Sequence, residues 1–140
     1  MGAWGPGNFE NDAALDWLYD FGENDFRLID RTLAGVAAMQ AVDELDADEA
    51  SEVLAAAECV AAAAGFPPDD PPEELAEWLA ENSPMPVTPE YVALGREAVA
   101  RVLAKSELWE LWLESDEYGE WETAVANLQS RLNQIPQKEE

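Results

Sequence analysis

Carboxylates are the residues through which this chain could carry out chemistry. Of its 140 residues, 31 are Asp or Glu and only 7 are Lys or Arg, which gives a formal net charge of −24 at pH 7. Two neighbouring carboxylates can act as general acid and base, as in glycoside hydrolysis, and several can bind a divalent cation. With so many acids, some pairs come close in any fold, so closeness alone does not identify an active site.

The residue types that usually support the carboxylates of an active site are missing. The chain has no histidine, which removes the commonest general base and metal ligand, together with Ser–His–Asp and Cys–His catalysis. Cys59 is the only cysteine and lies among alanines, so we expect a buried packing residue. The acidic segments 43–49 and 116–120 lack the Gly and Glu spacing of a calcium loop. We therefore predict no catalytic residue, no metal site and no cofactor.

The negative charge is concentrated in the middle of the chain. Residues 32–95 contain 14 acids and no Lys or Arg. A field of this sign opposes binding to nucleic acid phosphates and to anionic membranes, and it attracts basic proteins. A solvated face that only keeps the protein soluble would have the same composition, so both interpretations stay open.

The positions of Pro, Gly and capping residues predict an all-α fold, a single compact bundle of six or seven helices spanning 1–140. A Gly-rich loop at 1–10 precedes the helices, and a short charged tail at 136–140 follows them. No strand alternation or hairpin pattern is present. Apolar spacing and caps place the helices at about 12–21, 25–45, 48–64, 71–81 and 88–103, then for a turn or two after Ser106 and finally after residue 119.

These helices place several acids on shared faces. On the first helix, Asp12, Asp16 and Asp20 lie four residues apart and therefore share one face. On the third and fourth helices, the acids expected to bind a basic partner are Asp48, Glu49, Glu52, Glu74, Glu77 and Glu81.

The N-terminal loop is the other candidate contact. It contains three glycines among its first seven residues, together with the large side chains of Trp4 and Phe9. These side chains either contact a ligand or fold back and seal the core. No Lys, Ser or Thr follows the glycines, so the loop does not match a phosphate-binding pattern.

The opening segment 1–12, MGAWGPGNFEND, resembles the start of a bacterial family catalogued as domain of unknown function 4259. The segment LWELW at 108–112, and Trp121 and Leu128 after it, resemble the C-terminal pattern of that family. The resemblance implies a full-length, single-domain bacterial protein of the cytoplasm, and it implies no activity.

Three hypotheses follow, from different functional classes. The first is a non-catalytic acidic protein that occupies a basic surface of another protein, as immunity proteins, antitoxins and DNA mimics do. The second is a carboxylate-dependent or metal-binding hydrolase. The third is a structural subunit that self-associates through the apolar helix carrying Trp109 and Trp112. The N-terminus lacks the basic and apolar regions of a signal peptide, and no segment is apolar enough to span a bilayer, so we expect a cytoplasmic protein.

Overall fold

The computed structural model describes residues 8–9, 11–24, 26–37, 45–66, 68, 72–82, 89–104 and 106–135. All regular secondary structure within these ranges is helical, which confirms the all-α prediction and the upper of the two predicted helix numbers. The helices are α1 (Asp12–Asn24), α2 (Phe26–Ala37), α3 (Ala47–Ala63), α4 (Glu73–Asn82), α5 (Pro89–Ala104), α6 (Glu107–Leu113) and α7 (Tyr118–Gln134). Trp4 and the charged tail lie outside the described residues.

Local signals explain where α3 and α6 begin. Asp46 caps α3: its carboxylate accepts a hydrogen bond from the backbone N–H of Glu49, and the Glu49 side chain accepts one from the Asp46 backbone N–H. This capping box satisfies N–H groups that have no partner inside the helix. Ser106 caps α6 by accepting a hydrogen bond from the Trp109 N–H at 3.0 Å. Gly65 follows α3 with a φ of 103°, a backbone conformation that favours glycine.

The prediction that the second helix continues to Leu45 was wrong. Leu45 forms an isolated bridge with Ser106, and its carbonyl accepts a hydrogen bond from the Glu107 N–H at 2.8 Å. The described part of α2 ends at Ala37, and residues 38–44 lie outside the description. At Leu45 itself, the contacts with residues 106 and 107, distant in sequence, take the place of a helical turn.

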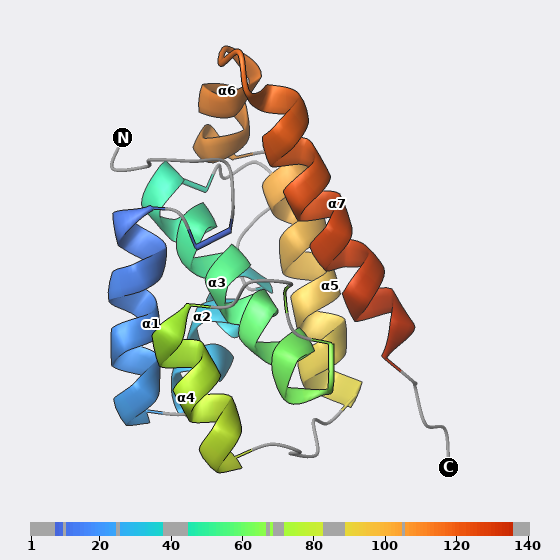
Figure 1. The fold of residues 1–140 in the computed structure, drawn as a ribbon. Coiled ribbons are helices and arrows are strands. Elements are labelled where there is room, and N and C mark those ends of the chain that lie inside the picture. The colour runs from blue at the N-terminus through green and yellow to red at the C-terminus, as the bar shows by residue number, and fades with distance from the viewer. Residues whose placement is uncertain are drawn as a thin grey trace.

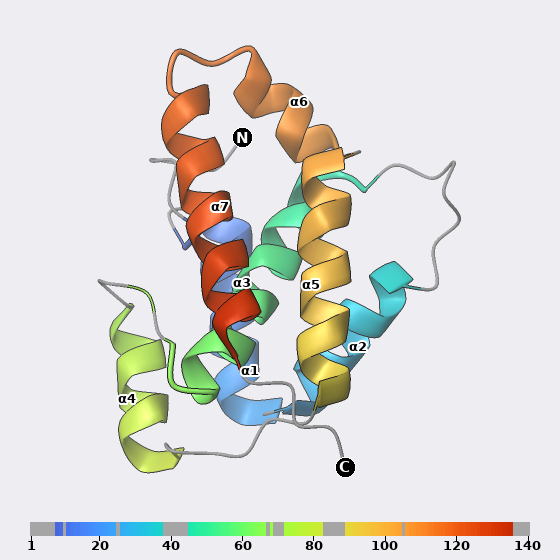
Figure 2. The ribbon, with the colours of Figure 1, turned by 90° about the vertical axis from the view of Figure 1, so that its right-hand side faces the viewer.

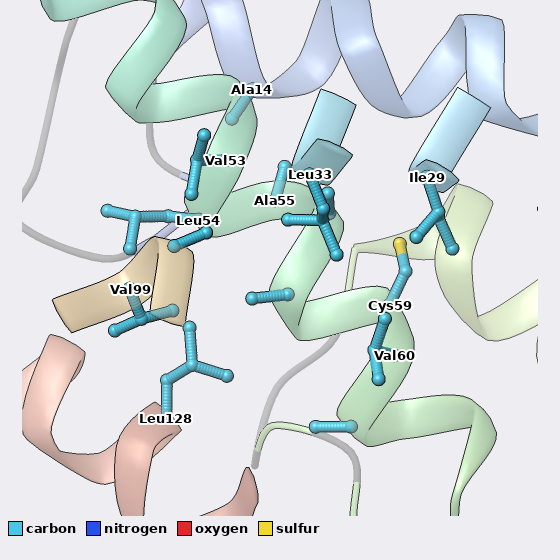
Figure 3. Packing of buried hydrophobic residues seen from close by; sticks show 14 of the residues in the cluster. Ala14, Ile29, Leu33, Val53, Leu54, Ala55, Cys59, Val60, Val99 and Leu128 are labelled. Atoms are coloured by element: carbon cyan, nitrogen blue, oxygen red, sulfur yellow. The ribbon is translucent and has the colours of Figure 1, made fainter. Parts of the chain in front are cut away.

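Helix α3 is the centre of the bundle. It contacts each of the other six described helices, and Figures 1 and 2 show it running through the middle of the molecule. Many of its residues are alanines, and the fully or almost fully buried ones are Ala50, Ala55, Ala56, Ala57, Ala61, Ala62 and Ala63. Alanine favours the helix and lets neighbouring helices approach closely. Figure 3 shows Val53, Leu54 and Val60 of α3 beside residues of the surrounding helices.

The other helices bury one stripe each, as their spacing predicts. On α7 the buried residues are Trp121, Val125, Leu128 and Leu132, and Ile135 follows them. On α1 and α2 the described ones are Ala14, Trp17, Leu18, Leu28, Ile29, Leu33 and Val36. None of the helices in the described ranges combines the length and the apolar composition that a bilayer crossing requires.

Candidate functional site

A buried ion pair joins the central helix to the last one. Glu58 of α3 is only 2% exposed, and its two carboxylate oxygens accept hydrogen bonds from Nη1 and Nη2 of Arg131 on α7, at 2.7 and 2.9 Å. Arg131 also donates from Nη1 to the Phe66 carbonyl and from Nε to Asn127 Oδ1. This two-point geometry satisfies both buried charges, which is the condition for such a pair to be tolerated inside a protein.

The same carboxylate holds the chain just before α1. Asn8 is buried, and its Nδ2 donates to Glu58 Oε2 at 2.7 Å. The neighbouring Phe9 is half-buried and packs against the core. Residues 8 and 9 are therefore anchored on α3, and we call Asn8, Glu58 and Arg131 the buried polar cluster.

Sequence reasoning missed the buried polar cluster. The stretch 53–64 consists of apolar residues apart from Glu58, and a lone carboxylate inside such a run is the signal that points to a buried pair. Nothing in the spacing identifies Arg131 as its partner, because 73 positions separate the two residues. The cluster joins three segments of the chain through hydrogen bonds, so we assign it a structural role.

Cys59 is fully buried beside Glu58 and faces α2, where Figure 3 shows Ile29 and Leu33. Burial raises the pKa of the Cys59 thiol well above its ordinary value, and the negative charge of Glu58 adds to this. A thiol that stays protonated is a poor nucleophile and a poor metal ligand. The position matches the packing role expected from sequence.

The predicted partner-binding acids fall into two groups. Asp48, Glu49 and Glu52 lie on the first turns of α3. Glu77 and Glu81 are exposed on α4, and Glu74 belongs to the same helix, although its side chain is outside the description. Figure 1 shows the start of α3 and the helix α4 at different ends of the molecule. The structure thus separates the six residues into an α3 group and an α4 group.

The α3 group meets the acidic face of α1. Glu49 and Glu52 line a cavity of about 500 Å³ together with Asp16 and Asp20 of α1, with Arg31 of α2 as its only cationic lining residue among those described. Apolar side chains complete the lining, namely Trp17, Leu28, Val36 and Leu45. The Trp17 indole N–H donates to Thr32 Oγ1 at 2.8 Å and so ties α1 to α2 at this point. We call this cavity the acidic cleft.

Within the acidic cleft, burial and neighbouring charges both disfavour the ionised form of Glu52. Burial raises the pKa of the half-buried Glu52 carboxyl above its ordinary value of 4.5, and the charges of Asp48, Asp46, Glu49 and Asp20 raise it further. Glu52 has no hydrogen-bond or ion-pair partner among the described residues. A carboxylate in this state gains from a cation brought next to it.

We predict that Glu52→Gln stabilises the protein at pH 7. Because the folded state raises the pKa of Glu52, its protonated form favours folding, and that contribution is lost as pH rises through the raised value. The neutral amide of Gln keeps this stabilising contribution at pH 7. The free energy of unfolding should therefore rise by less than about 1 kcal/mol, the range of partly screened charges. Urea unfolding at pH 7 and about pH 4 measures it. The gain should vanish at the lower pH, and a constant gain would contradict this explanation.

The remaining candidates are a metal site and the apolar helix α6. Within the described residues, no group of three or more Asp, Glu or Cys side chains is placed to hold a metal ion. On α6, Trp112 is buried and stacks on Trp121 with ring centroids 6.5 Å apart, and Trp109 is half-buried and donates its indole N–H to the Tyr118 hydroxyl at 3.3 Å. Leu111 and Leu113 are the exposed apolar residues of this helix.

Comparison with known proteins gives one result. The family model for a domain of unknown function, DUF4259, matches residues 2–124, which is most of the chain. This chain belongs to the DUF4259 family. The match to DUF4259 includes Asn8, Glu58 and every residue that lines the acidic cleft, and it ends within α7 before Arg131. No curated protein and no solved structure matches the chain.

Proposed function

We propose that this DUF4259 protein is a non-catalytic acidic binding protein that occupies a basic surface of another protein in the bacterial cytoplasm. The observation that carries the proposal is the state of the predicted acids. Among the described residues, Asp48, Glu49, Glu52, Glu77 and Glu81 form no ion pair, and all but the half-buried Glu52 are exposed. Their charge is therefore directed to solvent and available to a partner.

Two of the described arginines bind groups other than the predicted acids. Arg131 is used inside the protein by Glu58, and Arg96 donates to the Leu132 carbonyl at 3.0 Å. An unneutralised field of one sign accelerates encounter with a basic partner and discourages binding to nucleic acid. Acidic inhibitor proteins such as immunity proteins and antitoxins act through surfaces of this kind.

The rival hypotheses have weaker support in the described residues. A metal-binding hydrolase would need a group of metal-ligating side chains, and no group of three or more Asp, Glu or Cys is found in the described part of the chain. Self-association through α6 would have to use Leu111 and Leu113, because Trp112 is already packed on Trp121.

A charge-reversal pull-down tests the proposal. The test variant changes Asp48, Glu52, Glu77 and Glu81 to Lys, and the control changes Glu97, Glu114, Asp116 and Glu120, which are exposed elsewhere. Both variants move the net charge from −24 to −16. Each tagged protein is incubated with lysate of the source organism and washed at rising salt, and captured proteins are quantified by mass spectrometry after circular dichroism has confirmed folding.

We expect one stoichiometric basic protein that survives moderate salt, is reduced at least about tenfold by the test variant and is retained by the control. Two double variants, Asp48→Lys/Glu52→Lys and Glu77→Lys/Glu81→Lys, then show whether the α3 group or the α4 group makes the contact. Equal loss with the control, or only a mixture of basic proteins removed by salt, would refute the proposal.

A further inference from the structure

We infer that the acidic cleft receives an arginine side chain of the basic partner protein. This inference rests on the proposed function and adds the place and the chemistry of the contact. The cleft has a volume of about 500 Å³, within the range of about 300–1,000 Å³ that is typical of ligand pockets. It therefore differs from a flat acidic surface, since it can enclose a side chain.

The lining of the acidic cleft suits a long basic side chain. Trp17, Leu28 and Val36 supply apolar wall, along which the methylene groups of an arginine can pack. Carboxylates reach the same cavity from two helices, Asp16 and Asp20 from α1 and Glu49 and Glu52 from α3. A guanidinium carries five N–H donors in one plane, so it can bridge carboxylates that belong to different helices.

The charges of the acidic cleft are unbalanced in the direction that the inference requires. Among the described residues, four carboxylates and one cation, Arg31, line the cavity. Arg31 is exposed and forms no ion pair with a described residue, so it does not neutralise Glu52. The half-buried Glu52 carboxylate thus keeps both oxygens available to an incoming donor.

Gly35 is an exposed residue on the rim of the acidic cleft. It lies inside α2 and lines the acidic cleft, and a Cβ built on it would meet nothing within 4 Å. Glycine within a helix is less favourable than alanine by roughly 0.5–1 kcal/mol. Packing among the described residues does not require glycine here, whereas a side chain that enters the cleft would benefit from the open backbone.

The test is a peptide titration followed by nuclear magnetic resonance. The probes are the acetylated and amidated tripeptides Gly-Arg-Gly, Gly-Lys-Gly and Gly-citrulline-Gly, in which citrulline is the neutral isostere of arginine. The Trp17 indole N–H reports on the cleft, because it lies in the lining and bonds to Thr32. We expect the arginine peptide to give saturable shifts at Trp17 and at the cleft backbone, with weaker binding of lysine and none of citrulline.

Two variants separate the shape of the cleft from its charge. Gly35→Leu fills the opening and leaves the net charge at −24, and Glu52→Gln removes one acceptor and leaves the opening unchanged. We expect each to weaken binding of the arginine peptide by roughly tenfold, the loss of about one charge-assisted hydrogen bond. Glu97→Gln on α5 is exposed and carries the same charge change as Glu52→Gln, so it should bind like the original protein.

The outcomes distinguish this inference from the proposed function. Saturable shifts at Trp17, with an affinity that Gly35→Leu lowers by roughly tenfold, would support it. Shifts confined to α4, equal binding of citrulline or lysine, or indifference to Gly35→Leu would overturn it and leave the basic-partner proposal untouched, because the pull-down tests that separately. If the pull-down with the original protein captures no stoichiometric basic partner while the peptide still binds at the cleft, the proposed function alone is rejected.

Discussion

Replacement of Glu58 by alanine should lower the free energy of unfolding by about 3–5 kcal/mol, one of the two largest effects that we expect from single substitutions in this protein. The carboxylate is 2% exposed and accepts three hydrogen bonds, two from Arg131 and one from Asn8. Its removal leaves the Arg131 guanidinium, whose side chain is only 12% exposed, without a counter-charge. The measurement is urea unfolding followed by circular dichroism.

The control for Glu58→Ala is Glu97→Ala, which removes the same charge from an exposed position on α5 and should change stability by less than about 0.5 kcal/mol. A double-mutant cycle with Arg131→Met separates the pair from its surroundings. If the ion pair dominates, the double variant is more stable than Glu58→Ala, because no charge is left buried alone. Equal losses for Glu58→Ala and Glu97→Ala would show that the buried polar cluster does not stabilise the fold.

Replacement of Trp121 by alanine should cost about 3–5 kcal/mol, the range for deletion of a large aromatic side chain from a core. Trp121 is 2% exposed, stacks on Trp112 with an interplanar angle of 9° and lies against Tyr118 at a centroid distance of 6.0 Å. The substitution therefore opens a cavity where α6 meets α7. Guanidinium unfolding followed by far-ultraviolet circular dichroism measures the loss without depending on tryptophan fluorescence.

The matched control for Trp121→Ala is Leu111→Ala on α6, where the side chain is 39% exposed and a much smaller loss is expected. Trp121→Phe keeps part of the aromatic volume and should lie between the two. If Leu111→Ala were as damaging as Trp121→Ala in the isolated protein, the exposed side of α6 would be covered by something other than solvent. That result would return attention to self-association through α6.

Most of the helical architecture could be predicted from local sequence. The signals that begin or end helices act within a few residues of their own positions, so the spacing along the chain is enough to predict these helix ends. Examples are Ser106, Gly65 and Pro89. The apolar repeat of α7 predicted its buried face for the same reason, because positions three and four apart share a side of a helix. The prediction failed at Leu45, where a contact with Ser106, distant in sequence, replaces the helix.

The central place of α3 was harder to predict. Its apolar residues suggested one buried stripe, but almost the whole helix from Ala50 to Ala63 is buried, with Glu52 half-buried. An alanine-rich helix can lie on the surface or in the middle, since alanine favours the helix in both places. Whether such a helix lies on the surface or in the middle depends on how many other helices pack around it. The sequence of the helix itself does not give that number.

The same division holds for the candidate site. The amino-acid sequence by itself determined the excess of acids, their concentration in residues 32–95 and the outward position of acids such as Glu77 and Glu81, because charge and helical periodicity are local properties. Only the tertiary structure decided that Glu52 lies with Asp16 and Asp20 around one cleft, that the α4 acids lie elsewhere, and that Glu58 pairs with Arg131. These contacts join residues tens of positions apart, and they form only when the helices pack.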